Sequence, residues 1–239
     1  MAPSTWDIRG PVGTVTLSGA VGLAGQPWEL KSATTLGTLT LGDVQDAVVV
    51  VAASGKVGAV KAMRWLEGSL AAGTVTSITT TGVAATSTVP GISGDFGADV
   101  TLSYTGTKST LGTLTVAGWL TGAAISSAGA VGKVTLGGIE DSTLAAGDLV
   151  SAYKAISTLT VKGIKDAGSS FINSNVAAWT LGTVSVKGVQ TVNAGHDPAG
   201  FGIRARTITS YARDATKYPS KGLPGLIVDH ADDYTVQLA

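Results

Sequence analysis

The chain has 239 residues, equal numbers of acidic and basic side chains, 33 glycines and no cysteine. The balanced charge gives no reason to expect nucleic acid or an acidic membrane surface as a partner. The lack of cysteine excludes disulfides, thiolate metal sites and cysteine nucleophiles. No continuous apolar run approaches the roughly 18 residues of a membrane span, so we expect no membrane insertion.

The first residues, 1–11, precede the repeated part of the chain. They begin "MAPSTWDIRG" and lack the basic and then apolar regions of a secretory signal. We expect "TWDIRGP" to add a partial strand as an N-terminal cap, because an open sheet edge invites aggregation. Since the repeat starts almost at once, we expect a domain excised from a longer parent whose export signal lies elsewhere. The cysteine-free composition fits an extracellular or cell-surface location.

From Val12 onward one short sequence returns many times. Copies read "VGTVTLSGAV" at Val12, "LGTLTVAGWL" at Leu111 and "LGTVSVKGVQ" at Leu181. The intervals between copies are 24, 21, 18, 36, 20, 25, 25 and 25 residues, which are typical of one coil of a β-solenoid. The interval of 36 indicates a loop insertion at about residues 84–98. The opening residues are Val12, Leu36, Val57, Val75, Leu111, Val131, Ile156, Leu181 and, in a degenerate last copy, Arg206.

Each copy alternates as a strand does. Threonine, serine and lysine separate two columns of mostly apolar residues, so period two places both columns on one inward face. The threonine and valine content also favours strands. The first column is Val15, Leu39, Val60, Ile78, Leu114, Val134, Leu159, Val184 and Ile208; the second is Leu17, Leu41, Ala62, Thr80, Val116, Leu136, Val161, Val186 and Ser210.

A corner follows each strand. Glycine occupies it in most copies (Gly19, Gly82, Gly118, Gly138, Gly163 and Gly188), with Asp43 and Arg64 as exceptions. Glycine supplies the positive φ or the crowded backbone that a corner needs. We assign another inward residue just after it: Val44, Trp65, Val83, Trp119, Ile139, Ile164 and Val189.

A coil of about 20 residues cannot bury its own apolar face, so the copies must stack. The sequence therefore predicts an all-β fold, a single-stranded right-handed parallel β-helix (β-solenoid) of about nine coils over residues 12–210. Residues 211–239 are expected to form a C-terminal cap. Coil length varies too much for a hexapeptide left-handed helix. An antiparallel β-sandwich is the alternative.

The G-T-[VL]-T-[VL]-x-G-[VI] copies resemble the Gly/Thr-rich β-strand repeats of large secreted or cell-surface proteins in bacteria. The resemblance covers about Val12 to Ser210. It implies an exported stalk or scaffolding module, and it brings no catalytic residues to this chain.

Threonines fill the predicted outward positions. The resulting T-x-T rows are similar to the ice-binding face of hyperactive β-helical antifreeze proteins, although threonine is also common on any exposed sheet. Lys61 and Lys133 interrupt the array. The candidate binding residues are Thr14, Thr16, Thr38, Thr40, Thr113, Thr115, Thr158, Thr160, Thr183 and Ser185, and we place Thr207 and Thr209 in the same rows.

Carboxylates recur beyond the corners. Asp46, Asp141 and Asp166 occupy the same place in "VQDA", "IEDS" and "IKDA". Asp141 and Asp166 lie in consecutive copies, so Ca²⁺ held by their oxygens is the one cofactor this pattern suggests. The alternative is that each aspartate bonds its own turn. The calcium nonapeptide G-G-x-G-x-D is absent.

A carbohydrate-active enzyme of the β-helix type, a polysaccharide lyase or hydrolase, is the catalytic alternative. It would draw on Glu140, Asp141, Asp166, Lys162, Lys165 and Lys187, none of which falls in a family motif. Shared architecture is analogy alone. We therefore expect no enzyme.

Histidines and tryptophans give weaker signals. His196 lies in a Gly/Pro loop, and His230 lies in the acidic stretch "VDHADD", whose order does not match a zinc site. Trp65 and Trp119 are predicted to pack in the core, whereas Trp28 and Trp179 are expected to be more exposed.

Together these patterns predict a noncatalytic structural or adhesive module. The binding alternative is a module that recognises a polysaccharide or an ordered surface, including ice. Expected partners are polysaccharide or neighbouring repeat modules.

Overall fold

The computed structural model describes residues 2–32, 34–88, 90–106, 109–147, 155–192, 200–218 and 226–238. Within these ranges the chain is all-β and contains no helix. The strands are β1 (Ser4–Ile8), β2 (Val12–Val21), β3 (Trp28–Ser32), β4 (Thr35–Val51), β5 (Lys56–Ala72), β6 (Thr74–Thr80), β7 (Asp99–Leu102), β8 (Ser109–Thr121), β9 (Ala124–Ser127), β10 (Ala130–Glu140), β11 (Thr143–Ala146), β12 (Ala155–Val161), β13 (Phe171–Ile172), β14 (Asn175–Val186), β15 (Phe201–Arg213), β16 (Thr216–Tyr218), β17 (Ile227–Ala231) and β18 (Tyr234–Leu238).

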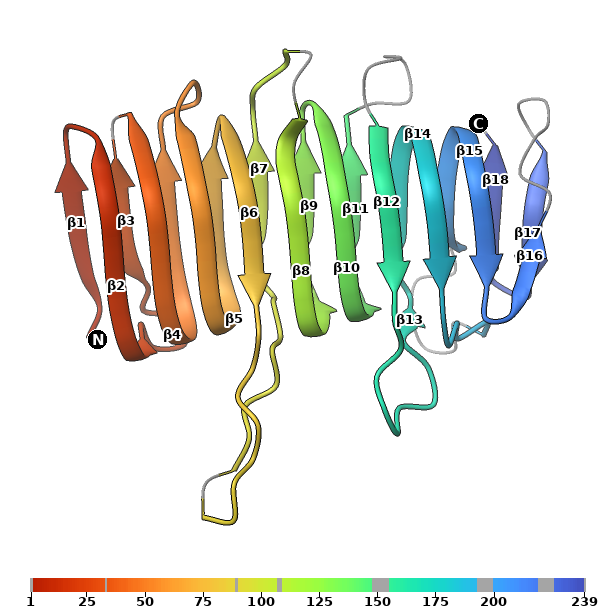
Figure 1. Ribbon diagram of the computed structural model, residues 1–239, viewed down its shortest axis with the longest axis horizontal. Coiled ribbons are helices and arrows are strands. Elements are labelled where there is room, and N and C mark those ends of the chain that lie inside the picture. Colours follow the sequence, from red (N-terminus) through yellow and green to blue (C-terminus); the bar gives the residue numbers. More distant parts are fainter. Residues whose placement is uncertain are drawn as a thin grey trace.

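The strands form two facing layers, and the long strands pass around a corner from one layer to the other (Figure 1). In Figure 1 the arrows of the near layer point down and those of the far layer point up. The front sheet consists of β2, β6, β8, β10 and β12 with residues 35–44 of β4, 56–65 of β5, 180–186 of β14 and 207–213 of β15. The back sheet consists of β1, β3, β7, β9, β11 and β18 with residues 47–51 of β4, 69–72 of β5, 175–178 of β14 and 201–205 of β15.

Within both sheets, strands from successive copies pair in parallel. Leu36 pairs with Val57, for example, and Leu114 pairs with Val134. Parallel strands need a crossover connection, which here is the strand of the other sheet. The all-β parallel architecture is therefore confirmed, and the pairing agrees with a β-solenoid. The antiparallel sandwich is wrong.

The core lies between the two sheets. The opening residues from Leu36 to Leu181 are almost completely buried, as are the first inward column from Leu39 to Val184 and the back-sheet residues that face them. In the first copy, Val12 and Leu17 are only half-buried, because no further coil covers them. The predicted inward columns are thus confirmed for the interior copies.

The last copy is shifted from its predicted register, by two residues at the opening residue and by three in the inward columns. Ile208 pairs with Leu181 and the buried Tyr211 pairs with Val184, whereas Arg206 and Ser210 are exposed. Arg206 therefore does not open the copy, and Ser210 does not point inward. The opening residue and the first inward residue of a copy both face the core, so an apolar residue such as Ile208 fits either place and the pattern alone does not distinguish them.

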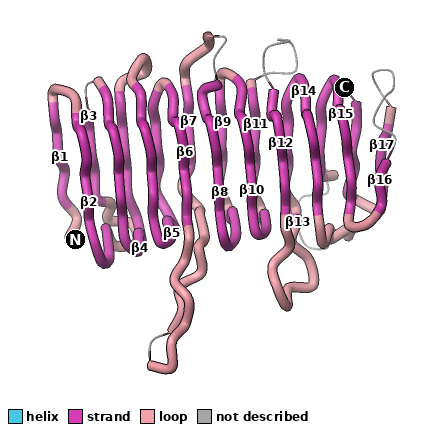
Figure 2. The backbone as a smooth tube through the Cα atoms, viewed as in Figure 1, coloured by secondary structure: helices cyan, strands magenta, loops and turns pink. Residues whose placement is uncertain are grey.

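The inward residue after the corner was misassigned in three copies. Val83 is 43% exposed, and Trp119 and Ile164 are half-buried. The column is instead filled by Phe96, Leu120 and Phe171. In two copies the cause is a loop between the corner and the inward residue. Both loops leave the same rim, as the two long pink segments in Figure 2 show.

A second glycine column stands at the start of the front strands, next to the opening residue. A Cβ on Gly58 would collide with the carbonyl oxygen of Gly37 in the preceding coil, and Gly182 meets Ser157 in the same way. At the open end, a Cβ on Gly13 would meet nothing within 4 Å. The close approach of stacked coils therefore favours the first glycine of the repeated G-T motif, although Thr76 and Ser157 hold this place in two of the coils.

Candidate functional site

The threonine face is the outer surface of the front sheet. Period two turns the residues between the inward columns outward. Thr14 pairs with Thr38, Thr16 with Thr40, and Thr113 with Ser77. The first row is Thr14, Thr38, Ala59, Ser77, Thr113, Lys133, Thr158, Thr183 and Ser210; the second is Thr16, Thr40, Lys61, Thr79, Thr115, Thr135, Thr160, Ser185 and Ala212.

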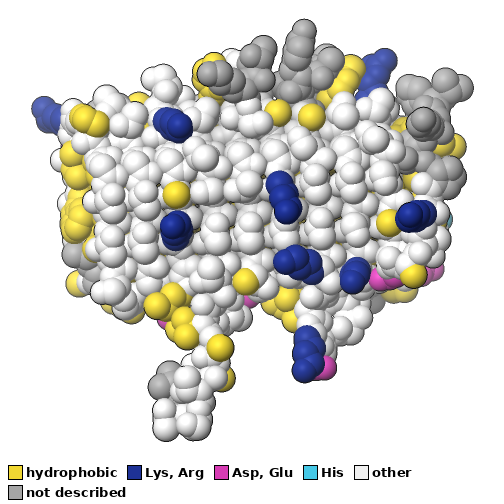
Figure 3. All heavy atoms as spheres, viewed as in Figure 1, with side chains coloured by type: hydrophobic (Ala, Val, Ile, Leu, Met, Phe, Trp, Pro, Cys, Tyr) yellow, Lys and Arg dark blue, Asp and Glu magenta, His cyan; other side chains and the backbone are white. Residues whose placement is uncertain are grey.

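The two rows form a regular hydroxyl array. Strands are spaced at about 4.8 Å, and residues two apart on a strand at about 7 Å. Figure 3 shows this side as mostly white, with a few dark-blue basic side chains across it. Most of the threonines are half-buried, and the Thr135 hydroxyl is buried without a protein hydrogen-bond partner. The face is therefore flat, polar and nearly uncharged.

The structure brings together all ten threonine and serine candidates, and it places Lys61 and Lys133 in the rows as predicted. Thr207 and Thr209 were assigned wrongly, because the last copy is shifted. Thr207 pairs with Thr180, outside both rows, and its hydroxyl donates to the Thr180 hydroxyl at 3.1 Å.

A charged pair replaces glycine at the corner of two successive coils. Arg64 donates from Nε and Nη2 to the two carboxylate oxygens of Asp43, at 2.5 and 2.9 Å. Both side chains are about a quarter exposed. The Asp43 hydrogen bond raises the pKa of Arg64, in spite of partial burial. A planar two-bond contact of this kind fixes the stacking of the two coils.

The structure separates the three recurrent aspartates. Asp46 is buried beside its register partner Glu67, and burial first and Glu67 second raise the pKa of Asp46. Asp141 is exposed, and its carboxylate accepts a 2.6 Å hydrogen bond from Nδ2 of Asn173. The pairing of Glu140 with Ile172 makes Asn173 the residue that follows in register.

Asp166 lies in the loop before β13, not in the place equivalent to Asp141. Both aspartates have positive φ, 48° at Asp141 and 65° at Asp166, as turn residues do. In the described ranges no three His, Asp or Glu side chains gather in a way that could hold a metal ion. The Ca²⁺ hypothesis thus rests on two carboxylates that sit at different places in their coils.

The remaining titratable candidates lie along the rim and at the C-terminal end. Glu140 is half-buried, and Lys162, Lys165 and Lys187 are exposed. His196 lies outside the described residues. His230 is exposed on β17.

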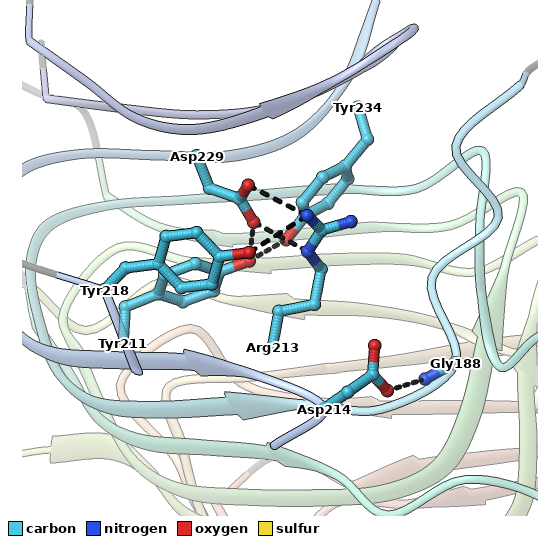
Figure 4. A network of polar contacts seen from close by, with 7 residues as sticks. All are labelled: Gly188, Tyr211, Arg213, Asp214, Tyr218, Asp229 and Tyr234. Atoms are coloured by element: carbon cyan, nitrogen blue, oxygen red, sulfur yellow. Dashed lines mark hydrogen bonds and ion pairs between the residues drawn. The ribbon is translucent and has the colours of Figure 1, made fainter. Parts of the chain in front are cut away.

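A buried polar network closes the C-terminal end of the rod (Figure 4). The Tyr211 hydroxyl donates to Oδ2 of Asp229 at 2.7 Å and lies 3.0 Å from the Tyr234 hydroxyl. Arg213 contacts the same carboxylate at 2.8 Å through Nε and 3.1 Å through Nη2, and its Nη2 also donates to the Tyr218 hydroxyl. The network joins β15, β16, β17 and β18.

Burial controls the chemistry of this network. Tyr211, Tyr234 and Asp229 are at most 5% exposed. Desolvation is the main cause that raises the pKa of both tyrosines. The phenols therefore stay neutral, and Tyr211 donates to Asp229 while the Tyr234 hydroxyl hydrogen-bonds with the Tyr211 hydroxyl. Sequence reasoning missed the network, and its only signal was the return of strand character in "DDYTVQLA".

The tryptophans follow the prediction only in part. Trp65 is fully buried as expected, and its Nε1 donates to the Glu67 carbonyl at 2.7 Å. Trp28, expected to be more exposed, is fully buried, because it packs edge-on against Trp6 with ring centroids 5.4 Å apart. Trp179 is half-buried under the Arg206 guanidinium, which lies 4.5 Å from the ring centroid.

Comparison of the chain with models of known protein families, with curated proteins and with solved structures gives no match. Among the described residues there is no helix of a length and hydrophobicity that would cross a membrane.

Proposed function

We propose that this chain is a noncatalytic structural module of an exported bacterial protein, with adhesive use of its flat face. In this proposal the rod is a right-handed β-helix of about nine coils, capped at its C-terminal end. The supporting observation is the continuous parallel register of the front sheet from β2 to β15. Its neighbours would be polysaccharide or further repeat modules at the cell surface.

The mechanism is geometric. Each coil is held to the next by backbone hydrogen bonds in two sheets and by continuous columns of buried aliphatic side chains. Interactions between neighbouring coils add along such a solenoid, so the free energy of unfolding grows with every stacked copy. The outer surfaces remain free to present hydroxyl groups at fixed spacing.

Enzyme assays test the noncatalytic part of the proposal. The chain is incubated with neutral and uronate-containing polysaccharides, and reducing ends and unsaturated uronate absorbance are followed. We expect no signal above buffer. Turnover by the wild type that Glu140→Gln or Lys162→Gln abolishes would overturn the proposal.

Pulling on single molecules tests the structural part. Handles attached at Thr5 and Thr235 load the rod between its two ends. We expect unfolding in a few large steps at high force, because each coil is locked to its neighbours. Gradual extension at low force would contradict a load-bearing role.

A second function, binding to an ordered surface, is favoured by the two hydroxyl rows, which only Ala59, Lys61 and Lys133 interrupt between β2 and β14. Ice recrystallisation inhibition and adsorption to crystalline polysaccharide measure it. Thr115→Lys should abolish binding. The double change Lys61→Thr and Lys133→Thr should strengthen binding, because it replaces both charged side chains in the rows by hydroxyl groups. If neither variant alters binding, the threonine face is not the binding surface.

A further inference from the structure

The back sheet carries a hollow with both polar and apolar lining near its C-terminal end. It has a volume of about 400 Å³ and lies where β14, β15 and β18 run side by side. Gly202 forms part of its lining, between Asn175 on one neighbouring strand and Thr235 on the other. Arg204 and Gln237 form the next row. Its size is within the range of small-molecule sites.

Glycine is needed at position 202 in the lining of the hollow. Gly202 has a φ of +140°, and a Cβ there would collide with the Thr235 carbonyl oxygen. The close approach of β15 and β18 therefore requires glycine at this position.

Each polar side chain around Gly202 can donate a hydrogen bond. The Gly202 N–H donates to Oδ1 of Asn175 at 3.2 Å, which leaves the Asn175 amide N–H₂ for another partner. Arg204 is exposed and makes no ion pair within the described chain, and the Gln237 side chain and the Thr235 hydroxyl have no protein hydrogen bond there. Among the described residues, none that lines the hollow is acidic.

We propose that this hollow binds the carboxylate of a small organic acid with the size and hydroxyl groups of a sugar acid. Arg204 binds the two carboxylate oxygens with its planar fork, a contact for which guanidinium is suited. Asn175, Thr235 and Gln237 contact the hydroxyl groups. The inference is independent of the proposed structural function, because a rod without this hollow would be equally stiff.

Titration with D-glucuronate tests the proposal, with D-glucose as the neutral control and inorganic sulfate as the competing oxyanion. Binding is followed by calorimetry and by the ¹⁵N–¹H signals of Gly202 and the Arg204 side chain. We expect saturable binding of glucuronate, with shifts at both residues, and none for glucose.

Two matched variants on β15 locate the site. Arg204→Gln should weaken glucuronate binding by about tenfold or more, the effect of a lost charge-assisted pair. Arg206→Gln removes an exposed guanidinium from the same strand, one that stacks on Trp179 instead of lining the hollow. This variant should keep its affinity for glucuronate within about twofold of the wild type. Thermal melting confirms that both variants fold.

Several results would overturn the proposal. These are equal binding of glucose and glucuronate, binding of sulfate without glucuronate, and no saturation by glucuronate. Glucuronate affinity that Arg204→Gln leaves unchanged would also refute it.

Discussion

The two ends of the rod are closed in different ways. At the N-terminal end, β1 pairs only with β3 and β2 only with β4 among the described residues, and Trp6 covers the buried Trp28. The Trp28 Nε1 has no hydrogen-bond partner. At the C-terminal end, the antiparallel strands β16 and β17 fold against β15 and β18, and the polar groups of the network satisfy one another. One end is covered by apolar rings, and the other is locked by hydrogen bonds.

The difference shows that the repeated sequence determines the structure of the interior coils, whereas each end needs a structure of its own. An interior coil stacks on similar coils on both sides, whereas one face of an end coil must be covered by residues outside the repeat. The predictions below separate the contributions of the two ends and of the interior.

The largest expected effect is at the C-terminal network. Asp229→Ala leaves the buried Tyr211 and the half-buried Arg213 without their acceptor, and should lower the free energy of unfolding by about 3–5 kcal/mol. Asp214→Ala is the control, because this exposed carboxylate accepts one bond from the Gly188 N–H; with the added strain of alanine at a φ of 54°, the change should cost about 1–2 kcal/mol. Urea denaturation measures both. Equal losses would show that the network does not lock this end.

The glycine column distinguishes an interior coil from the open end. Gly58→Ala forces a backbone shift against Gly37 and should lower the free energy of unfolding by about 1–3 kcal/mol. Gly13→Ala has free space and should change it by at most about 0.5 kcal/mol. The comparison fails if Gly13→Ala is as damaging as Gly58→Ala.

Alkaline pH should weaken the C-terminal end. Burial raises the pKa of Tyr211 and Tyr234, so the folded chain keeps both protonated where the unfolded chain ionises them, near pH 10. Their stabilisation is complete below about pH 10. It is lost as pH rises, by up to about 1.4 kcal/mol per pH unit for each tyrosine.

Denaturation at pH 9, 10 and 11 measures this loss, and Tyr211→Phe should reduce its slope by about half. A stability that stays constant to pH 11 would show that the two phenols ionise as easily in the folded chain as in the unfolded one.

The smallest expected effect lies toward the N-terminal end. Because the pKa of Asp46 is raised, its ionised form at neutral pH costs stability. Asp46→Asn should therefore raise the free energy of unfolding at pH 7 by less than about 1 kcal/mol. The gain should vanish as pH falls below about 3.9, where the carboxyl is protonated in both states. A gain that is the same at pH 3 and pH 7 would assign it to packing instead.

The sequence predicted the interior coils well. Period-two alternation identifies Leu39, Leu114 and Leu159 as buried and the threonines between the columns as outward-facing, because each side chain repeats the environment of its neighbour one coil away. The outward rows that form the candidate surface followed directly. Such alternation does not tell which of two inward places an apolar residue holds, and this is why Ile208 was placed in the first inward column and Arg206 in the opening place that Ile208 holds.

The repeat pattern did not predict the insertions or the two ends. Because loops of different length separate the corner from the next inward residue, counting positions does not show that Phe96 and Phe171 occupy the same inward column as Trp65. The C-terminal network and the hollow at Gly202 depend on contacts between residues far apart in the chain, such as Tyr211 with Asp229, and no local pattern marks them. The burial of Trp28 likewise depends on Trp6 in the first strand.

The two long loops on one rim have a practical consequence. The loop after β6 returns through an antiparallel bridge between Val83 and Ile92, and the front and back sheets continue past it in register. Foreign peptides grafted between these two residues would therefore be displayed at a fixed position along the stack of coils.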